Sequence, residues 1–307
     1  MLSTMDLEKL PRPALDSVLS SLDTRSALAL RGYSTCFQRE LGDLRWNSNT
    51  LFCRFVSDPW AFRCKLRETD AVVAGGLATQ FLAREIWPGS GMDVFVGFPE
   101  GTLPPIDFVC PASGSLQEER SAYRGAFVAA CVSRANILLK YFQEEEGYFA
   151  VERTNSAEYA NAPWERIGLE RDGQVVQVIW WRRWESDFQT VPAVLQTFFS
   201  TAVMNFITWQ HAVSVFPHLT FVDREMIVFP ASYVSGRVVD RYVWRGWPVR
   251  HYTGAGEGVT TIRVLGDKHC CLLQFSESGW QEPCTELSFP ACRFVLTQHR
   301  LEILSKP

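Results

Sequence analysis

The sequence lacks the long apolar segments of membrane proteins and the opening pattern of secreted ones. No part of its 307 residues forms an uninterrupted apolar run of the ~18 residues or more that cross a bilayer. The first residues, MLSTMDLEKLPRPALDSVL, do not place a basic segment before an apolar one, as a secretion signal does. We therefore expect a cytoplasmic or nuclear protein with no membrane partner.

An excess of positive charge is also lacking. The chain has 30 Lys and Arg against 34 Asp and Glu, a net charge of −4. Proteins that bind nucleic acid through their overall charge are basic, so the composition argues against a nucleic-acid partner. WWRRWESD is the local exception, because Arg182 and Arg183 stand among tryptophans and could contact phosphates beside stacked bases. Strand alternation would equally bury those tryptophans and expose the arginines.

Closely spaced cysteine pairs are missing too. The nine cysteines are scattered, whereas zinc sites use tight pairs separated by two to four residues. Adjacent Cys270 and Cys271 would point to opposite faces of a strand. An odd number of cysteines without a secretion signal indicates reduced thiols, and we interpret them as small buried hydrophobic residues. The residues that could supply soft metal ligands are His269, Cys270, Cys271, Cys284, Cys292 and His299.

What the N-terminal part does contain is helical periodicity. Leu15, Leu19 and Leu22 recur at helical spacing within residues 9–45, which predicts two or three short helices. Further on, SDPWAFRCKLRETD places Ser-Asp before Pro59, the pattern of a capped helix start.

Strand and helix patterns alternate in the middle of the chain. SAYRGAFVAACVSRANILLKYFQEEEGY predicts a long helix that stops near Gly147. Asp172-Gly173, between two apolar runs, predicts a hairpin turn. TVPAVLQTFFSTAVMNFITWQHAVSVF predicts one or two buried helices, with His211 as a core histidine on an apolar helix.

Strand patterns cluster after about residue 225, and no linker or repeat separates the parts. We expect an α+β fold, a mixed β-sheet flanked by helices, in one compact body. Its parts would be an N-terminal helical region (1–48), a core (49–224) and a β-rich C-terminal extension packed on that core (225–307).

The stretch VVAGGLATQFLAREIWPGSGMDVFV, residues 72–96, has the clearest local organisation. An apolar strand meets Gly75-Gly76, an amphipathic helix follows, and Asp93 lies at the start of the next apolar strand. A glycine turn at a helix N-terminus frees backbone N–H groups that suit phosphate oxygens. Gly75 and Gly76 are therefore the candidate phosphate-binding residues.

This stretch resembles the signature of the nucleotidyltransferase superfamily that includes DNA polymerase β. In that signature, an apolar-Gly-Gly/Ser turn is followed, after a helix, by two acids one residue apart. The chain also resembles a group of fungal proteins with such a core, through EGY at 146–148, VVQVI at 175–179, STAVMNFIT at 200–208, FPHLTF at 216–221 and RVLGDKHCCL at 263–272. The resemblance covers roughly residues 55–275 and implies a nucleotidyltransferase-like core.

For active members, the resemblance implies two strand carboxylates and a third on a neighbouring strand, which hold two metal ions around an NTP. Here Gly91 replaces the first acid, Asp93 keeps the second, and Gln177 stands where the third is expected. Leu77 replaces the common serine of the turn. The nearest spare carboxylate, Asp107, lies in a predicted loop.

These departures predict a catalytically degenerate protein that acts as a binding or regulatory module. Asp93 is the one candidate catalytic and metal-binding residue, and restoring the family acid by Gly91→Asp should recover some metal binding. The alternative is an active nucleotidyltransferase that binds Mg²⁺ and NTP; otherwise no cofactor is expected.

Other patterns do not indicate a catalytic centre. Glu144, Glu145 and Glu146 are consecutive acids, which we interpret as a solvated helix end rather than a metal site. The chain has no Gly-x-Ser-x-Gly elbow and no plausible Cys-His nucleophile pair.

The N-terminal helices carry a third functional hypothesis. Leu-Pro, an amphipathic helix, Leu-Asp, and a second helix before GYSTCFQREL resemble an F-box, a helical module that docks on Skp1. YSTCF stands where the family has Val-Ser and a later aromatic residue. The chain would then be a substrate adaptor with Skp1 or another protein as partner; otherwise these helices form a cap on the core.

Overall fold

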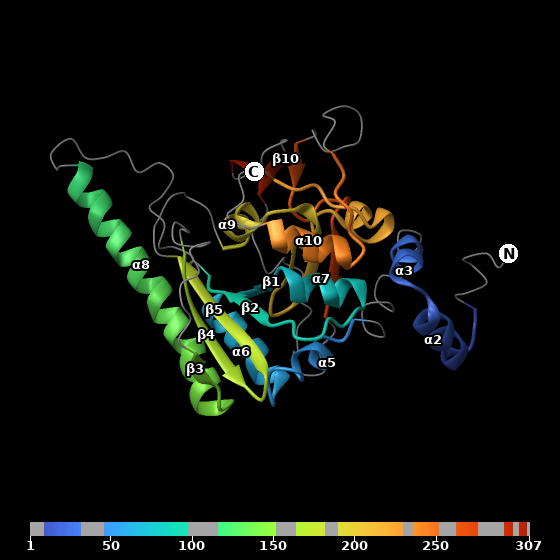
Figure 1. The fold of residues 1–307 in the computed structure, drawn as a ribbon, viewed down its shortest axis with the longest axis horizontal. Helices are drawn as coiled ribbons and strands as arrows, with labels where there is room; N and C mark the ends of the chain where they lie inside the picture. Colours follow the sequence, from blue (N-terminus) through green and yellow to red (C-terminus); the bar gives the residue numbers. More distant parts are fainter. Residues whose placement is uncertain are drawn as a thin grey trace.

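The computed structural model describes residues 9–31, 46–97, 116–151, 164–181, 190–229, 236–251, 262–275, 292–296 and 301–305. Its centre is an eight-stranded mixed sheet with the order β3-β4-β5-β2-β1-β6-β7-β9 (Figure 1). The strands are β1 (Val72–Ala74), β2 (Met92–Phe95), β3 (Phe149–Val151), β4 (Trp164–Arg171), β5 (Gln174–Trp181), β6 (Asn205–Ile207), β7 (His211–Ser214) and β9 (Cys271–Gln274).

All neighbours in this sheet are antiparallel except β2 and β5, which run parallel. A smaller sheet has the order β11-β10-β8. It contains β8 (Arg263–Val264), β10 (Arg293–Leu296) and β11 (Leu301–Ser305). The predicted C-terminal extension thus supplies this second sheet and also adds β9 to the edge of the main one.

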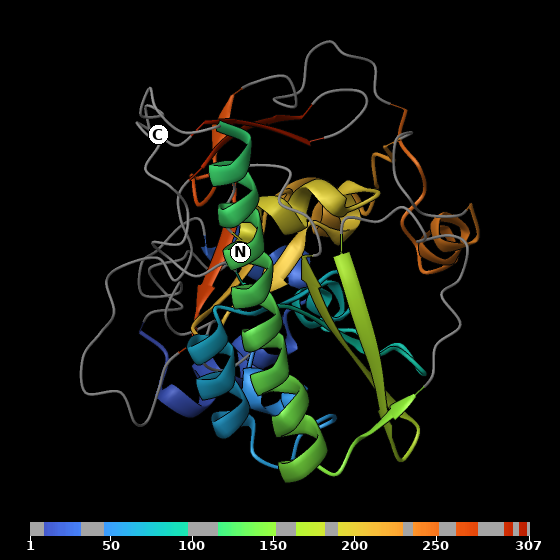
Figure 2. The same cartoon turned by 90° about the vertical axis from the view of Figure 1, so that its left-hand side faces the viewer.

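Helices cover the main sheet, as the α+β prediction requires. In Figure 1, α5 and α6 lie below β1 and β2, and α9 and α10 lie above them. Figure 2 shows the long α8 running beside α6. The bounds are α5 (Ser48–Phe52), α6 (Pro59–Thr69), α7 (Gly76–Ala83), α8 (Leu116–Lys140), α9 (Thr190–Thr197) and α10 (Gly236–Trp244). Short turns of helix span Tyr141–Glu145, Thr201–Val203 and His218–Asp223.

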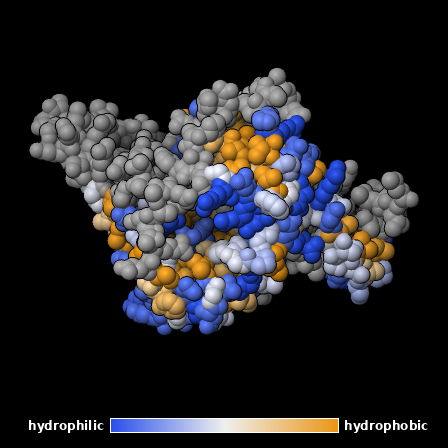
Figure 3. Space-filling model, viewed as in Figure 1, coloured by the Kyte–Doolittle hydropathy of each residue, from blue (hydrophilic) through white to orange (hydrophobic). Residues whose placement is uncertain are grey.

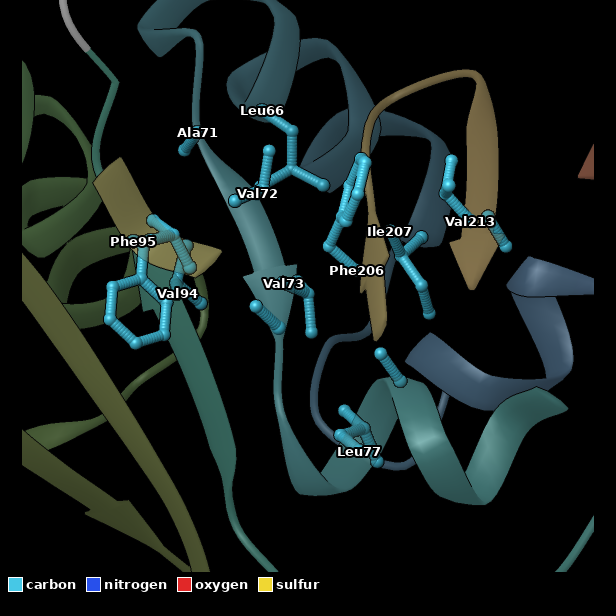
Figure 4. Packing of buried hydrophobic residues seen from close by; sticks show 14 of the residues in the cluster. Leu66, Ala71, Val72, Val73, Leu77, Val94, Phe95, Phe206, Ile207 and Val213 are labelled. Atoms are coloured by element: carbon cyan, nitrogen blue, oxygen red, sulfur yellow. The ribbon is translucent and has the colours of Figure 1, made fainter. Parts of the chain in front are cut away.

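Apolar residues of the central strands form the main core. Figure 4 shows Leu66 of α6 beside Val72 of β1, with Ile207 on the neighbouring strand β6 and Val213 on β7 beyond it. All four are buried. Burying one such side chain contributes about 1.5–3 kcal/mol, so the three-residue β1 is held by packing on both faces.

Two local predictions are confirmed. Asp58 caps α6, because its Oδ1 accepts hydrogen bonds from the N–H groups of Trp60 (2.9 Å) and Ala61 (3.0 Å). Asp172 and Gly173 have φ values of 50° and 76°, which are the positive angles of the tight turn that joins twisted antiparallel strands. They join β4 to β5.

One segment differs from its prediction. Only residues 190–197 of the expected buried helices form an α-helix; β6 and β7 follow as a hairpin, so His211 lies in a strand. Thr208 fixes the turn, since its Oγ1 accepts the N–H groups of Gln210 (3.2 Å) and His211 (2.9 Å). Strands buried on both faces have continuous apolar runs, and periodicity alone does not separate these from buried helices.

The N-terminal helices α2 (Arg12–Ser21) and α3 (Thr24–Arg31) dock at the end of α7. The Thr24 hydroxyl donates to the Ala83 carbonyl (3.1 Å), and Arg84 donates to the Leu22 carbonyl (3.2 Å). Leu15 and Leu19 are buried in the same apolar cluster as the sheet, and Leu22 is partly buried against it. This packing favours the cap over an F-box, whose apolar face must be available to a partner. YSTCF lies outside the described residues. No helix in the described part of the chain is long and apolar enough to cross a membrane.

Candidate functional site

The predicted strand, glycine turn, helix and strand at 72–96 are confirmed as β1, Gly75, α7 and β2. Gly75 has φ +73° and ψ −132°, a backbone conformation that side chains with a Cβ rarely adopt. Its N–H donates to the Asn205 carbonyl (3.1 Å). Asp93, the second residue of β2, pairs with Ala74 immediately before the turn. The turn and Asp93 are therefore neighbours, as the sequence predicted.

A buried polar network beneath α7 holds the glycine turn in place. The Thr79 hydroxyl donates to the Gly75 carbonyl (3.0 Å), and the Asn205 amide donates to Thr79 Oγ1 (3.0 Å) and to the Ala202 carbonyl (2.8 Å). Asn205 and Ala202 belong to the STAVMNFIT block. That block therefore has a structural role, since buried polar groups of this kind are costly unless satisfied.

The neighbour of Asp93 on the adjacent strand is a neutral side chain. Parallel pairing sets Asp93 opposite Gln177, and side chains opposite one another in a sheet share a face. Arg166 on β4 donates to Gln177 Oε1 at 3.4 Å. The position at which a third carboxylate was expected is thus an amide with a guanidinium beside it. Asp107 lies outside the described residues.

Gly91 is a glycine for packing reasons. A Cβ at this position would lie 2.7 Å from the Val175 carbonyl oxygen, closer than such atoms approach without a backbone shift. Gly91→Asp is therefore not the simple restoration that the sequence suggested. The close approach of β5 therefore accounts for the glycine at this position.

Tyr242 of α10 covers the N-terminus of α7. Its hydroxyl is 3.1 Å from where a Cβ of Gly76 would be, and the ring packs edge-on against Trp87 at 5.6 Å between centroids. Burial raises the pKa of Tyr242; the nearby Arg245 opposes this rise and Asp93 adds to it. Sequence reasoning missed this residue, although Val238, Val239 and Tyr242 recur at helical spacing.

The loop between α7 and β2 is fixed to the same cluster. Gln80 donates to Ser90 Oγ (2.7 Å) and accepts the Trp87 N–H (2.8 Å). The Arg245 guanidinium lies over the Trp87 ring at 4.0 Å from its centroid. Buried polar and aromatic contacts therefore occupy the space around the turn.

Glu146 corrects the interpretation of the three consecutive acids. Glu144 and Glu145 are exposed, but the Glu146 side chain is 2% exposed and pairs with Arg171 at 3.0 Å. It also accepts the Ser57 N–H (2.8 Å) and the Tyr141 hydroxyl (2.7 Å). Burial alone would raise the pKa of the Glu146 carboxyl, but these hydrogen bonds hold it below the ordinary value. The EGY block marks a structural ion pair.

The remaining candidates are also structural where they are described. His211 is buried, and burial lowers its pKa to about 4, so the ring is neutral at pH 7. Burial raises the pKa of Cys270 to about 11 and that of Cys292 to about 12, which disfavours reactive thiolates. Among the described residues no three His, Cys, Asp or Glu side chains group as a metal site. Candidates outside the described ranges are Arg182, Arg183, Cys284 and His299.

Within RVLGDKHCCL, Arg263 and Asp267 form a paired unit. Two guanidinium nitrogens of Arg263 contact the Asp267 carboxylate at 2.7 and 3.0 Å, and a third donates to the Val215 carbonyl (2.9 Å). The Asp267 carboxylate also accepts the N–H groups of His269 and Cys270. This block therefore fastens the turn before β9 to the main sheet.

Comparison with known proteins adds no relative: no family model, no curated protein and no solved structure matches the chain.

Proposed function

We propose that this chain is a nucleotidyltransferase-fold protein that has lost catalysis and acts as a binding or regulatory module. The observation that carries the proposal is the pairing of Asp93 with Gln177, whose amide is in turn bound by Arg166. The strand, turn and helix that would present a nucleotide are in place, but the acids that would hold its metal ions are replaced.

Charge supports the loss of catalysis. Two divalent ions bring four positive charges, and Mg²⁺ demands hard oxygen ligands in near-octahedral geometry. Asp93 is the only carboxylate among the three positions that the family uses. A guanidinium close to a divalent ion repels it, and Arg166 is hydrogen-bonded to the side chain opposite Asp93. Arg166 therefore disfavours metal at this point of the sheet.

The packing of Tyr242 over the glycine turn independently supports the loss of catalysis. A triphosphate would have to approach the N–H groups at the start of α7, and the Tyr242 hydroxyl lies over Gly76. Tyr242 is 5% exposed and packs on Trp87, Phe199 and Trp247. Because this cluster closes the turn, α10 would have to move before a nucleotide could bind there.

Calorimetry with MnCl₂ and each NTP tests the proposal. We expect no metal-dependent NTP binding by the wild type, and none by Asp93→Ala. Tight binding by the wild type that Asp93→Ala abolishes would show an active site. A carboxylate from outside the described residues, such as Asp107, would then complete it.

A gain-of-binding variant tests the same geometry. Gln177→Glu places a second carboxylate opposite Asp93, and Arg166→Gln in the same chain removes the guanidinium that would neutralise it. The double variant should bind Mn²⁺ about tenfold more tightly than the wild type, since local negative charge doubles at a spacing that a shared ion can use. Gln177→Glu alone is the control and should gain less.

A further inference from the structure

The outward side of α10 has an unusual combination of side chains. Arg237, Asp240, Arg241 and Trp244 recur at intervals of three and four residues, so they share one side of the helix. We call these four residues the α10 outer face. The opposite side carries Tyr242, which packs into the aromatic cluster beside the glycine turn. One side of α10 therefore packs against the protein, and the α10 outer face is exposed to solvent.

Trp244 is the most exposed large hydrophobic residue among those described, with 90% of its side chain accessible. Most other described tryptophans are more enclosed: Trp60 has a relative accessibility of 38%, and the buried ones are Trp46, Trp87, Trp180, Trp181 and Trp247. Burial of such a ring contributes a few kcal/mol, so an open indole on an ordered helix is a feature that the fold itself does not use.

Arg237 and Arg241 are exposed, and neither forms an ion pair with a carboxylate in the described part of the chain. Several other arginines are paired with acids in the fold, among them Arg171, Arg224, Arg250 and Arg263. In Figure 3 the surface where α10 lies in Figure 1 is mainly hydrophilic. The α10 outer face therefore offers guanidinium groups that have no carboxylate partner among the described residues, beside an open aromatic ring.

We propose that the α10 outer face binds single-stranded nucleic acid, with a base stacked on Trp244 and two phosphates held by Arg237 and Arg241. The two arginines are four residues apart, which is about 6 Å along the helix axis. Planar guanidinium groups suit phosphate oxygens. Aromatic rings with adjacent cationic groups are the recurring way in which proteins hold unpaired bases without reading their sequence.

A single strand fits this face better than an acidic protein segment does. Tryptophan anchors in protein interfaces lie within a ring of contacts that exclude water, whereas Trp244 is the single apolar member of the outer face. A duplex keeps its bases stacked on one another and offers no free ring to the indole. The net charge of −4 makes the interaction local, weak and sensitive to salt.

Fluorescence anisotropy with a labelled 20-nucleotide oligo(dT) at low salt is the direct test, with a duplex of the same length for comparison. The wild type should bind the single strand more tightly than the duplex. Trp244→Ala should weaken binding about tenfold with the salt dependence unchanged. Arg241→Gln should weaken it and reduce the slope of log K against log salt by about 0.7.

Asp240 and Arg25 provide matched controls. Asp240 lies on the same face and would repel phosphates, so Asp240→Asn should tighten binding. Arg25 is an exposed arginine on a different helix, α3. Arg25→Gln makes the same charge change outside the α10 outer face and should leave binding unchanged. Because Asp240, Arg241 and Trp244 are all exposed, their variants should keep the wild-type melting temperature, which separates lost binding from lost fold.

Three results would overturn the proposal. The first is no binding of oligo(dT) at low salt. The second is binding that Trp244→Ala and Arg241→Gln leave unchanged, or that a change of Arg182 and Arg183 abolishes instead. The third is binding of a poly-glutamate peptide, sensitive to the same variants, in place of the oligonucleotide, which would assign the face to an acidic protein partner.

Discussion

Glu146 and Asp93 both belong to sequence blocks that carry the family resemblance, yet their surroundings are opposite. Glu146 is buried and receives hydrogen bonds from Ser57, Tyr141 and Arg171. Asp93 is half-buried at the mouth of a strand, opposite the neutral Gln177. The first carboxylate is surrounded by donors that satisfy it. The second faces an amide on the neighbouring strand, where the proposed function would require another acid.

The contrast shows that a sequence motif alone does not decide whether an acid is structural or functional, because its role depends on the residues it contacts. The glycine turn makes Asp93 look like the functional acid, and three acids in a row make Glu146 look like a solvated one. Arg171 contacts the Glu146 carboxylate and backbone carbonyl, and it lies over the Tyr148 ring at 4.7 Å. A long-range partner, and not the local pattern, decides that Glu146 is structural.

Removing Glu146 should have the largest effect on stability. Glu146→Ala leaves the Arg171 guanidinium, 26% exposed, without its carboxylate and removes the acceptor of the Ser57 and Tyr141 hydrogen bonds. Breaking a fully buried pair costs about 3–5 kcal/mol, and solvent at Arg171 sets the expected loss near the lower end of that range. Urea denaturation measures the loss. Glu144→Ala, two residues away and exposed, is the control and should change the free energy of unfolding by less than about 0.5 kcal/mol. If Glu146→Ala and Glu144→Ala lower the free energy of unfolding equally, Glu146 is not a structural residue and the interpretation as a solvated helix end is right.

As the pH falls, Glu146 and His211 should change the free energy of unfolding over different pH ranges. The pKa of Glu146 is lowered in the fold, so its stabilisation is present above the pKa of the unfolded chain and is lost as pH falls through the folded value. Burial lowers the pKa of His211 to about 4, so the unfolded chain takes up this proton first, from about pH 6.5 downward.

Between pH 7 and pH 4, His211 should therefore cost the fold up to ~3 kcal/mol. Denaturation curves across this range should show the decline in the wild type and a flatter profile in His211→Gln. An unchanged profile would mean that the ring is charged, or satisfied differently, in the folded protein.

Local signals explain the parts of the fold that could be predicted. Asp58 before Pro59 predicted a helix start, Asp172-Gly173 predicted a hairpin, and Gly75 predicted the turn beside Asp93. In each case the determining atoms lie within a few residues of one another. Even the absence of a third acid on the strand next to Asp93 was visible, because VVQVI carries Gln177 and no carboxylate.

Long-range contacts explain what could not be predicted. The β6–β7 hairpin is buried throughout, so its apolar run matched a helix equally well. Tyr242 reaches Gly76 from a helix far along the chain, and Val175 approaches Gly91 through a strand pairing. Glycine spacing in the sequence does not reveal which backbone passes close by.

Gly91→Asp should destabilise the fold, by less than Glu146→Ala does. A Cβ at 2.7 Å from the Val175 carbonyl forces β2 and β5 apart, and overpacking of this kind costs about 1–3 kcal/mol. Gly125→Ala is the opposite control, because a Cβ there meets nothing within 4 Å and alanine favours a helix by about 0.5–1 kcal/mol. A Gly91→Asp protein of wild-type stability that binds Mn²⁺ would show that β5 yields readily and that one acid was all the site lacked.

Asp93→Asn should have the smallest effect, and it decides whether the two carboxylates really differ. Asparagine keeps the shape of the side chain and removes its charge. Asp93 is half-buried, whereas the Glu146 side chain is buried among three donors. We therefore expect Asp93→Asn to change the free energy of unfolding by about 1 kcal/mol or less. Melting of Asp93→Asn and of the matched Glu146→Gln measures both under one set of conditions. If the two variants lose equal stability, Asp93 is held in an internal ion pair and is a structural residue like Glu146. A small loss for Asp93→Asn beside a large one for Glu146→Gln would show that the Asp93 charge, unlike that of Glu146, contributes little to the stability of the fold.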